Sequence, residues 1–297
     1  MTSPTRFAVS LPQQVADGAF DPDAFRAYLA RVEELGFHSA WTREMALSPS
    51  PLLGPLEVMT YAAACTERLR IGCAVFVSVL HQPVQLAKSL MTLDQLSRGR
   101  LEVGFGLGGR DHLSSFGIPS EGFVARFVEG LELMKSCWTQ PRVSFNGRFF
   151  QVEGGMEPKP YQKPHPPVWI GGHRPAAIRR AVRHGDGFVG AGAATTPAFA
   201  EQVRVLKAEL EQAGRDPETF GVAKRVYVSV GERDRIGDEL RRIYGTADSA
   251  VAGSPDECVH GLREVIEAGA DLVLLDPMTD EAEQLERLAE EVLPALS

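Results

Sequence analysis

The sequence predicts an α/β protein folded as a single closed (β/α)8 barrel, a TIM barrel. Short β-branched or apolar runs alternate with longer stretches of helical periodicity, which is the pattern of repeated βα units around a parallel sheet. Eight strands in strict alternation favour a closed barrel over an open doubly wound sheet, and 297 residues suit one such barrel. We therefore expect one domain, residues 1–297, with functional side chains in the loops that follow the strands.

The first βα unit shows how the elements are assigned. Residues 7–11 are a short apolar run and form the first strand. Asp21 followed by Pro22 is a helix start, and Gly36 is a helix end, so the first helix is expected between them.

Units two to four repeat this pattern with short connections. In the second helix, Leu56, Met59 and Ala63 lie on one apolar face. Strands are expected at residues 37–42, 70–77 and 100–105, and helices at residues 55–66, 83–96 and 120–138.

An insertion is expected between the fourth helix and the fifth strand. Residues 140–167 are rich in proline, glycine and aromatic residues. Within them Asn146-Gly147 is a strong hairpin signal, and short strands at 143–145 and 148–150 flank it. We interpret this segment as a lid or a subunit contact rather than a second domain.

Four further units complete the barrel. Strands are expected at residues 168–170, 187–189, 220–230 and 271–275, with helices near Ala176, Pro197, Pro255 and Glu281. Residues 235–251 are long enough to hold an additional helix and a mobile loop.

The charge balance limits the partners. A formal net charge of −8 leaves no basic surplus to neutralise phosphates, so neither nucleic acid nor an anionic membrane is an expected partner. A small molecule is expected instead. The N-terminal residues lack a basic start followed by a long apolar stretch, and no apolar run approaches the length that spans a membrane. We expect a cytoplasmic protein.

The cysteines do not suggest a metal site. Cys65, Cys73, Cys137 and Cys258 are far apart and form no CxxC pair, so neither a zinc site nor a redox dithiol is indicated. We expect them to be small buried apolar residues and expect no metal.

Glycines follow the fourth strand. Gly104, Gly106, Gly108 and Gly109 remove side chains where this strand leaves the barrel, so a flat ring or a phosphate could approach the backbone there. An ordinary glycine-rich turn is the alternative. A Rossmann fingerprint is a weaker one, because these glycines lie on the fourth strand and the first unit carries no such motif.

Several stretches together resemble one known family. The most specific is LDQLSRGRL at residues 93–101; the others are GFHSAW at 36–41, Phe149 ahead of Pro158, PVWIGG at 167–172 and DGF at 186–188. From Phe7 to Leu296 the chain resembles the bacterial luciferase-like monooxygenase superfamily of flavin- and deazaflavin-dependent oxidoreductases. The resemblance implies a (β/α)8 barrel with an insertion after the fourth helix, often dimeric, that binds FMN or the deazaflavin coenzyme F420.

The resemblance also implies where the cofactor lies. Many relatives have a non-proline cis peptide bond that presses on the central ring, and the matching bond is Ala74-Val75. Gly171-Gly172 precedes a helix start, where free N–H groups favour the cofactor phosphate, and the loop after strand six could complete this cradle. An ordinary loop and a solvent-exposed Arg174 are the alternatives. The expected cofactor contacts are Ala74, Val75, Gly106, Gly108, Arg110, Gly171, Gly172, His173, Arg174, Gly190, Ala191 and Gly192.

The proton donor of such relatives is altered in this chain. They often carry an Asp-His pair after strand two, whereas this chain has Glu44-Met45, which keeps the carboxylate and lacks the imidazole. His112 after strand four and His81 after strand three are candidate replacements, so the expected catalytic residues are His112, Glu44 and His81.

Two glutamines after the first strand are further candidates. Gln13 and Gln14 occupy positions where relatives place polar groups that face the substrate or the ring, and a capped turn is the alternative.

The leading functional hypothesis is an oxidoreductase that transfers hydride between coenzyme F420 and a small organic substrate. FMN is the alternative cofactor, in which case the enzyme could be a monooxygenase that uses reduced flavin and oxygen. A barrel that binds flavin without turnover is the rival from another class, and Met45 is its support. An aldolase is disfavoured because no lysine is evident at a strand end. We expect a homodimer.

Overall fold

The computed structural model describes residues 4–15, 18–47, 50–109, 113–231, 233–278 and 280–296. Eight parallel strands follow one another around a ring, and the pairing of β8 with β9 closes it. The barrel strands are β1 (Arg6–Ser10), β2 (Ser39–Thr42), β3 (Arg70–Val77), β4 (Leu101–Gly106), β7 (Val168–Gly171), β8 (Gly187–Gly190), β9 (Gly221–Val230) and β11 (Leu272–Asp276). The predicted (β/α)8 barrel is confirmed.

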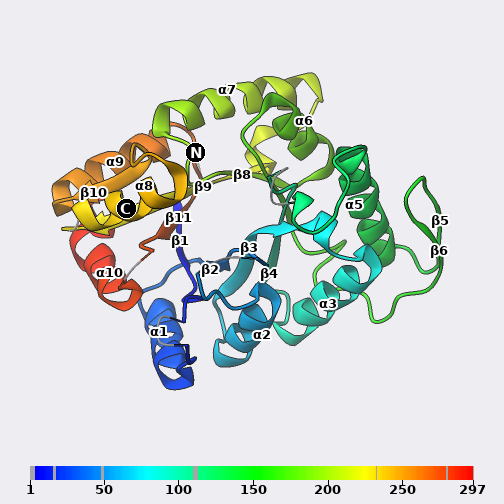
Figure 1. The fold of residues 1–297 in the computed structure, drawn as a ribbon, viewed down its shortest axis with the longest axis horizontal. Helices are drawn as coiled ribbons and strands as arrows, with labels where there is room; N and C mark the ends of the chain where they lie inside the picture. The colour runs from blue at the N-terminus through cyan, green and yellow to red at the C-terminus, as the bar shows by residue number, and fades with distance from the viewer. Residues whose placement is uncertain are drawn as a thin grey trace.

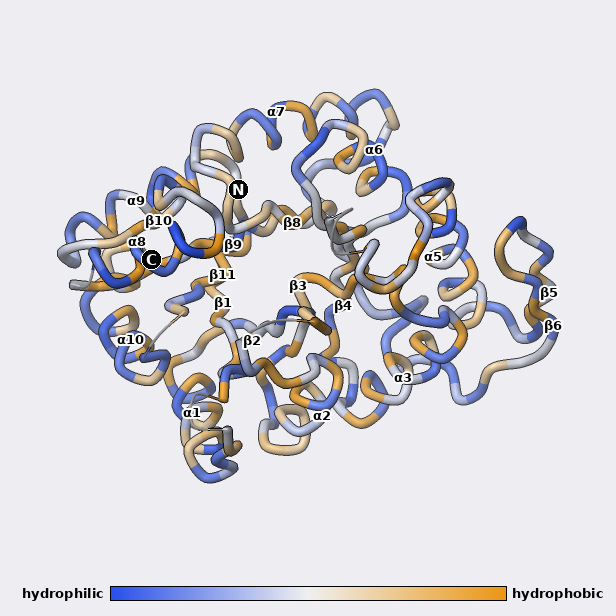
Figure 2. The backbone as a smooth tube through the Cα atoms, in the orientation of Figure 1, coloured by the Kyte–Doolittle hydropathy of each residue, from blue (hydrophilic) through white to orange (hydrophobic). Residues whose placement is uncertain are grey.

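Helices surround the strands (Figure 1). They are α1 (Pro22–Glu34), α2 (Pro55–Cys65), α3 (Pro83–Leu96), α5 (Phe123–Thr139), α6 (Pro175–His184), α7 (Thr196–Gln212), α8 (Arg233–Tyr244), α9 (Pro255–Glu267) and α10 (Glu281–Arg287). Short 3-10 turns cover Ser78–Leu80, Pro217–Thr219 and Leu293–Ala295, and a π-helical turn covers Leu288–Val292. Hydrophilic and hydrophobic residues alternate along the helices, as expected where one face packs on the barrel (Figure 2).

The helix starts follow the signals in the sequence. The Asp21 carboxylate accepts the backbone N–H groups of Asp23 and Ala24 at the start of α1, with Pro22 as the first helical residue. At the start of α9, Ser254 and Glu257 form a reciprocal capping box.

Two tryptophans dominate the inner layer of the barrel. Trp41 and Trp169 are almost fully buried and meet edge to face, with ring centroids 6.1 Å apart. The buried carboxylate of Glu102 accepts the Trp169 indole N–H at 2.8 Å and pairs with Arg70 at 2.6 Å. The barrel interior is therefore packed with side chains rather than open. A larger apolar layer lies between the strands and the helices.

The LDQLSRGRL stretch ties the barrel to its surroundings. The Arg100 guanidinium donates to the carbonyls of Ala63, Thr66 and Leu69 at the end of α2 and the turn after it. The Asp94 carboxylate accepts both the backbone and the side-chain N–H of Gln162 in the insertion. This motif therefore has a structural role.

The insertion carries the predicted hairpin, but its turn is longer than expected. Strands β5 (Val143–Asn146) and β6 (Gln151–Gly154) pair antiparallel, so residues 147–150 form the turn and the second strand begins later than predicted. The physical reason is Glu129 of α5, whose carboxylate accepts the backbone N–H groups of residues 148, 149 and 150 and removes them from strand pairing. The hairpin projects beyond α3 and α5 (Figure 1).

The segment between β9 and α9 also differs from the prediction. It contains the expected additional helix, α8, but a short strand, β10 (Ala250–Gly253), follows it instead of a mobile loop. Residue Tyr227 of β9 pairs with Ala250 on one edge and Asp276 of β11 on the other. β10 therefore pairs with the second half of the same edge of β9 whose first half pairs with β8.

Three further properties bear on function. All four cysteines are free thiols, and three are buried. Within the described ranges, no helix is long and apolar enough to cross a membrane. In the same part of the chain, no group of three or more His, Cys, Asp or Glu side chains is placed to hold a metal ion.

Candidate active site

The end of β3 carries the feature that the resemblance implies. The Ala74-Val75 peptide bond is cis, and the pairing of β3 with β4 shifts register between Cys73 and Phe76. The Val75 side chain turns toward glycines of β4 and β7, the next two strands of the barrel. A methyl group on Gly106 would lie 2.5 Å from Val75 Cγ2, and one on Gly171 would lie 3.0 Å from Val75 Cγ1. These glycines therefore make room for Val75 as well as baring the backbone.

A buried arginine holds this bond from across the barrel. Arg225 lies on β9, yet it donates to the carbonyl of Ala74 at 2.9 Å and to the carbonyl of Thr42 at 3.4 Å. Because β2 and β3 are not neighbours of β9, the guanidinium must cross the barrel interior. Its Nη1 also lies 3.4 Å from the Oδ2 of Asp276, which is 2% exposed.

A second arginine shares the same carboxylate. Arg43 follows β2, and its Nη1 lies 3.4 Å from Asp276 Oδ2. Its backbone is fixed by Gln13, whose side chain accepts the Arg43 N–H and donates to the Arg43 carbonyl and to the Leu53 carbonyl. Gln13 therefore positions the loop after β2.

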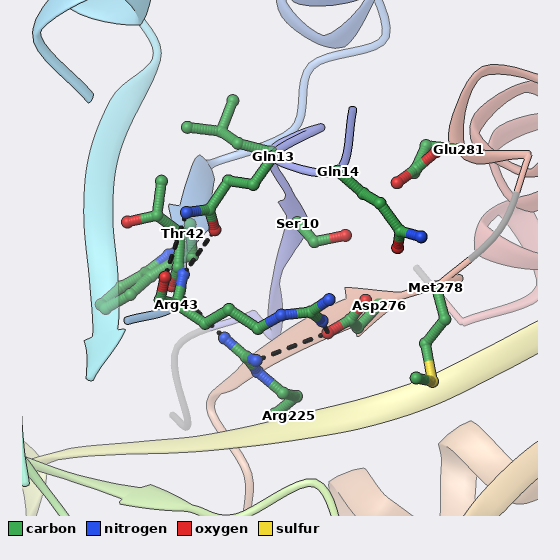
Figure 3. A pocket seen from close by; sticks show the side chains of 11 residues that line it. Ser10, Gln13, Gln14, Thr42, Arg43, Arg225, Asp276, Met278 and Glu281 are labelled. Carbon is green, nitrogen blue, oxygen red and sulfur yellow. Dashed lines mark hydrogen bonds and ion pairs between the residues drawn. The ribbon is translucent and has the colours of Figure 1, made fainter. Parts of the chain in front are cut away.

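These side chains border a small pocket of about 10 Å³, room for about one water molecule, at the carboxyl ends of β1, β2, β9 and β11 (Figure 3). Gln14 and Glu281 lie across it from Arg43. The lining residues are Ser10, Leu11, Gln13, Gln14, Trp41, Thr42, Arg43, Arg225, Asp276, Met278 and Glu281. Burial raises the pKa of Glu281, and the nearby Asp276 carboxylate acts in the same direction.

Two of the predicted catalytic residues meet. Nε2 of His81 lies 2.7 Å from Oε1 of Glu44, and Oε2 of Glu44 accepts the backbone N–H of Val77 at 2.6 Å. Glu44 is 6% exposed and His81 is 32% exposed, so the imidazole remains accessible. Met45, where relatives often have histidine, is largely exposed. The carboxylate after β2 therefore has an imidazole partner, supplied by the loop after β3.

The residues predicted to form the phosphate cradle lie at the end of β7 and the start of α6. Gly171 ends β7, and His173 and Arg174 are exposed just before α6. Among the described residues, no side chain caps the start of α6. Pro175 has no N–H, and the N–H groups of Ala177 and Ile178 donate to the Arg174 carbonyl, so the Ala176 N–H is the first-turn donor left for an anion. Gly172 packs closely on this helix, because a methyl group there would lie 2.5 Å from the Ala177 Cβ.

A buried lysine supports the loop after β8. Lys224 of β9 is 2% exposed, and its Nζ donates to the carbonyls of Ala191 and Arg225 at 2.6 and 2.8 Å and lies 3.5 Å from that of Gly192. Burial, with the adjacent Arg225 charge, lowers the pKa of Lys224 to about 7. Gly190 lies against the Phe199 ring and Gly192 against Tyr227.

The other predicted residues fall into two groups. Gly108 has a left-handed backbone (φ +69°), a conformation that favours glycine, and packs against Val77. Arg110 and His112 lie outside the described residues.

Arg43, Arg225, Asp276, Lys224 and Glu281 were not among the predicted site residues. Charged residues inside or at the end of a barrel strand, as in Lys224-Arg225 and at Asp276, are the signal that could have identified them.

Comparisons with known proteins identify the family. A family model described as luciferase-like monooxygenase matches residues 1–247. An F420-dependent glucose-6-phosphate dehydrogenase from Beutenbergia cavernae is 29% identical, and the match covers 93% of this chain and 94% of the relative.

Solved structures share the fold. An F420-dependent secondary alcohol dehydrogenase in complex with an F420–acetone adduct has a TM-score of 0.85 at 20% identity, covering 99% of this chain and 100% of that one. The oxygenating constituent of 3,6-diketocamphane monooxygenase from Pseudomonas putida, in complex with FMN, has a TM-score of 0.79 at 16% identity, covering 98% of both chains. With a family model that matches most of its length, this chain belongs to the luciferase-like monooxygenase family.

Proposed function

We propose that this protein is a coenzyme F420-dependent oxidoreductase that transfers hydride between the cofactor and a small organic substrate. The observation that carries the proposal is the similarity, over nearly the whole of both chains, to a relative named as F420-dependent. When bound, the deazaflavin supplies the two-electron hydride chemistry, and the protein supplies binding, orientation and exclusion of water.

The residues at the carboxyl ends of the strands fit such a cofactor. The backbone of Ala74 and Val75 would bear on the ring, with Arg225 holding the Ala74 carbonyl in place. The uncapped start of α6, with Gly172, His173 and Arg174, would bind the phosphate. Lys224 holds the carbonyls of the loop after β8, which leaves the N–H groups of that loop available to the same anion.

We propose that the His81–Glu44 pair moves the proton that accompanies hydride transfer. A carboxylate bonded to one ring nitrogen fixes the orientation of the imidazole, as a general acid or base requires. Glu44 is itself fixed by the Val77 N–H, two residues beyond the cis bond. This pair weakens the argument from Met45 for a barrel without turnover.

The cofactor is tested by titrating the purified protein with F420 and, separately, with FMN, and following the fluorescence of each. Saturable micromolar binding of F420, followed by oxidation or reduction of the bound cofactor by a substrate, supports the proposal. Saturable FMN binding with no F420 binding would instead support a flavin-dependent monooxygenase. Tight binding with no turnover across a substrate panel would support the non-catalytic barrel.

The proton-transfer role is tested with His81→Asn and Glu44→Gln. Loss of the imidazole is expected to lower kcat by a factor on the order of 10² with little change in the F420 Kd, and to flatten the pH profile of kcat near neutrality. Glu44→Gln keeps the size of the side chain and is expected to shift that profile. An unchanged profile in both variants contradicts the role.

We also propose that the chain acts in the cytoplasm as a homodimer. Free, mostly buried thiols suit a reducing compartment, and the projecting β5–β6 hairpin offers a surface for subunit contact. Light scattering of the purified protein measures the assembly. A monomer mass at micromolar concentration would contradict the dimer.

A further inference from the structure

β10 leaves one edge of the sheet unpaired. It is the terminal strand of the nine-stranded sheet, and its partner in the described part of the chain is β9. Gly253 turns its carbonyl toward β9, where the carbonyl accepts the Gly231 N–H at 2.6 Å. Because the peptide groups of successive residues in a strand point to opposite edges, Val251 also faces β9, and the N–H and C=O groups of Ala252 face the free edge. A free edge of this kind is a template for another strand.

A groove of about 750 Å³ opens along this edge. Residues of α8 and α9 form its walls, and the start of α7 also lines it (Figure 1). Ala252 packs beside Ile236 and Leu240 of α8 on one face of β10. Val251 packs on α9 on the other face, where a methyl group on Gly261 would lie 2.8 Å from its Cγ1. The free edge of β10 therefore lies at the base of a slot between two helices.

The groove is large enough for one more strand. Neighbouring strands lie about 4.8 Å apart, and four residues of strand extend about 13 Å. With about 10 Å for the side chains on both faces, a strand of that length occupies roughly 600 Å³. The groove exceeds this volume, so a strand can be added to β10 without displacing α8 or α9.

The lining of the groove is acidic. Five carboxylates line it, against two guanidinium groups and one imidazole. Both guanidinium groups already have carboxylate partners, since Arg233 pairs with Glu257 and Arg241 pairs with Asp238. The lining carboxylates that are exposed and have no ion pair within the described ranges are those of Asp234, Asp248 and Asp256.

These charges select the occupant. Lysine and arginine side chains are favoured beside unpaired carboxylates. An anion is disfavoured, because Thr195 and Ser254 already cap the helix starts that reach the groove. Edge-to-edge pairing with a second copy of this chain is disfavoured as well, because it would bring two acidic grooves together.

We propose that the groove binds an extended segment of a partner polypeptide that carries lysine or arginine side chains, and that this segment adds to the free edge of β10 as a further strand. Main-chain hydrogen bonds to Ala252 supply affinity, and the basic side chains at alternate positions reach the carboxylates of α8 and α9. None of the lining residues belongs to the site proposed for the cofactor, so the inference stands independently of the proposed function.

The test titrates fluorescently labelled peptides against the full chain and follows their polarisation. One peptide alternates lysine with valine, and a second alternates glutamate with valine. A third has the lysine–valine sequence with a methyl group on every backbone nitrogen, which removes the N–H donors and retains the charge. The unmethylated lysine peptide is expected to bind on the order of tenfold more tightly than either of the others. Its binding is expected to slow hydrogen exchange in residues 250–253 and to leave exchange in the β5–β6 hairpin unchanged.

Two variants separate the strand edge from the charge. Ala252→Pro removes the N–H that faces the groove and keeps the pairing with β9, because proline is tolerated on the open side of an edge strand. It is expected to abolish binding of the lysine peptide. Combined Asp234→Asn, Asp248→Asn and Asp256→Asn substitutions, which keep the strand edge, are expected to weaken binding severalfold and to reduce its salt dependence. Asp23→Asn removes an exposed carboxylate of α1 and is the matched control, with unchanged binding expected.

Several outcomes would overturn the proposal. They are equal binding of the lysine and glutamate peptides, binding that backbone methylation leaves unchanged, no saturable binding of the lysine peptide, and an affinity that both groove variants retain. Displacement of the peptide by spermidine at an equal concentration of positive charge would assign the groove to small cations instead. A dimer that Ala252→Pro converts to a monomer, measured by light scattering, would assign the edge to a second copy of the chain and contradict the proposal as well.

Discussion

The Val75 side chain packs against Gly106 of β4 and Gly171 of β7. A methyl group on Gly106 would lie 2.5 Å from Val75 Cγ2, so Gly106→Ala must displace the Val75 side chain. Overpacking of this kind costs about 1–3 kcal/mol. We expect a fall of that size in the free energy of unfolding, measured by urea denaturation, and weaker F420 binding, measured by fluorescence.

The same stretch supplies the control for this substitution. No described atom lies within 4 Å of the corresponding position at Gly109, so Gly109→Ala is expected to change little. Adding Val75→Ala to Gly106→Ala should restore most of the stability because it removes the colliding methyl groups. A single variant as stable as Gly109→Ala would contradict the packing argument.

Lys224 makes a pH-dependent contribution to stability. Its pKa is lowered to about 7 by burial, with a contribution from Arg225, against 10.5 for an unperturbed lysine. Between pH 7 and 10.5 the unfolded chain keeps the Lys224 proton that the folded chain has released, so the free energy of unfolding rises with pH over this range. Below pH 7 the lysine is charged in both states, and the full cost of burying that charge lowers the stability of the fold. The rise is at most about 1.4 kcal/mol per pH unit.

Urea denaturation from pH 7 to 8.5 measures this rise. Lys224→Met removes the titrating group, so the variant should show a shallower slope than wild type over this range. Tyr28, Tyr227 and Cys73, whose pKa values are raised by burial, act in the opposite direction at higher pH. Equal slopes in the two proteins would show that Lys224 is already charged in the fold at pH 8.5.

At the scale of single residues, the sequence predicts which residues lie in the candidate site better than it predicts which of them contact one another. Glu44 and His81 could each be found because they follow strands, but their contact joins residues 37 positions apart and depends on how two loops turn. Lys224 and Arg225 lie in an apolar run, where alternation sends one toward Phe199 of α7 and the other across the barrel interior. Neither destination is visible without the closed sheet.

At the scale of elements, the β5–β6 hairpin depends on one carboxylate from α5. The Glu129 carboxylate accepts three consecutive backbone N–H groups. Each hydrogen bond to a charged group contributes about 1.5–3 kcal/mol to stability. Glu129→Gln should therefore loosen the turn. We expect faster hydrogen exchange across residues 147–154, with protection of β3 and β4 unchanged.

Glu132, one turn along the same helix, provides the matched control. It lies 3.7 Å from His184 and is half exposed, so Glu132→Gln should leave exchange in the hairpin as it is in wild type. Equal protection of the hairpin in both variants would contradict the anchoring role. The longer turn could not be predicted from Asn146-Gly147, because it is set by this tertiary contact rather than by the local turn preference.

At the scale of the whole molecule, alternation of strands and helices was sufficient to predict the barrel. The eight barrel strands fall at or within two residues of the expected ranges, because buried parallel strands are apolar runs bounded by helix caps and glycines. β10 is the exception. Its residues are small and only partly buried, so its pattern does not distinguish a strand from a loop.

Closure of the barrel makes the C-terminal strand indispensable. β11 pairs with β1 on one edge and with β9 on the other, although it lies beyond residue 247, where the family match ends. A chain of residues 1–247 would leave β1 and β9 as two open edges and would expose the apolar layer that α9 covers. We expect this truncated chain to aggregate or to lack cooperative unfolding, whereas residues 1–297 should unfold in one transition.

Near-ultraviolet circular dichroism and urea denaturation compare the two chains. A cooperative, native-like residues 1–247 fragment would show that the first seven units form a stable open sheet, and it would contradict the single-domain organisation.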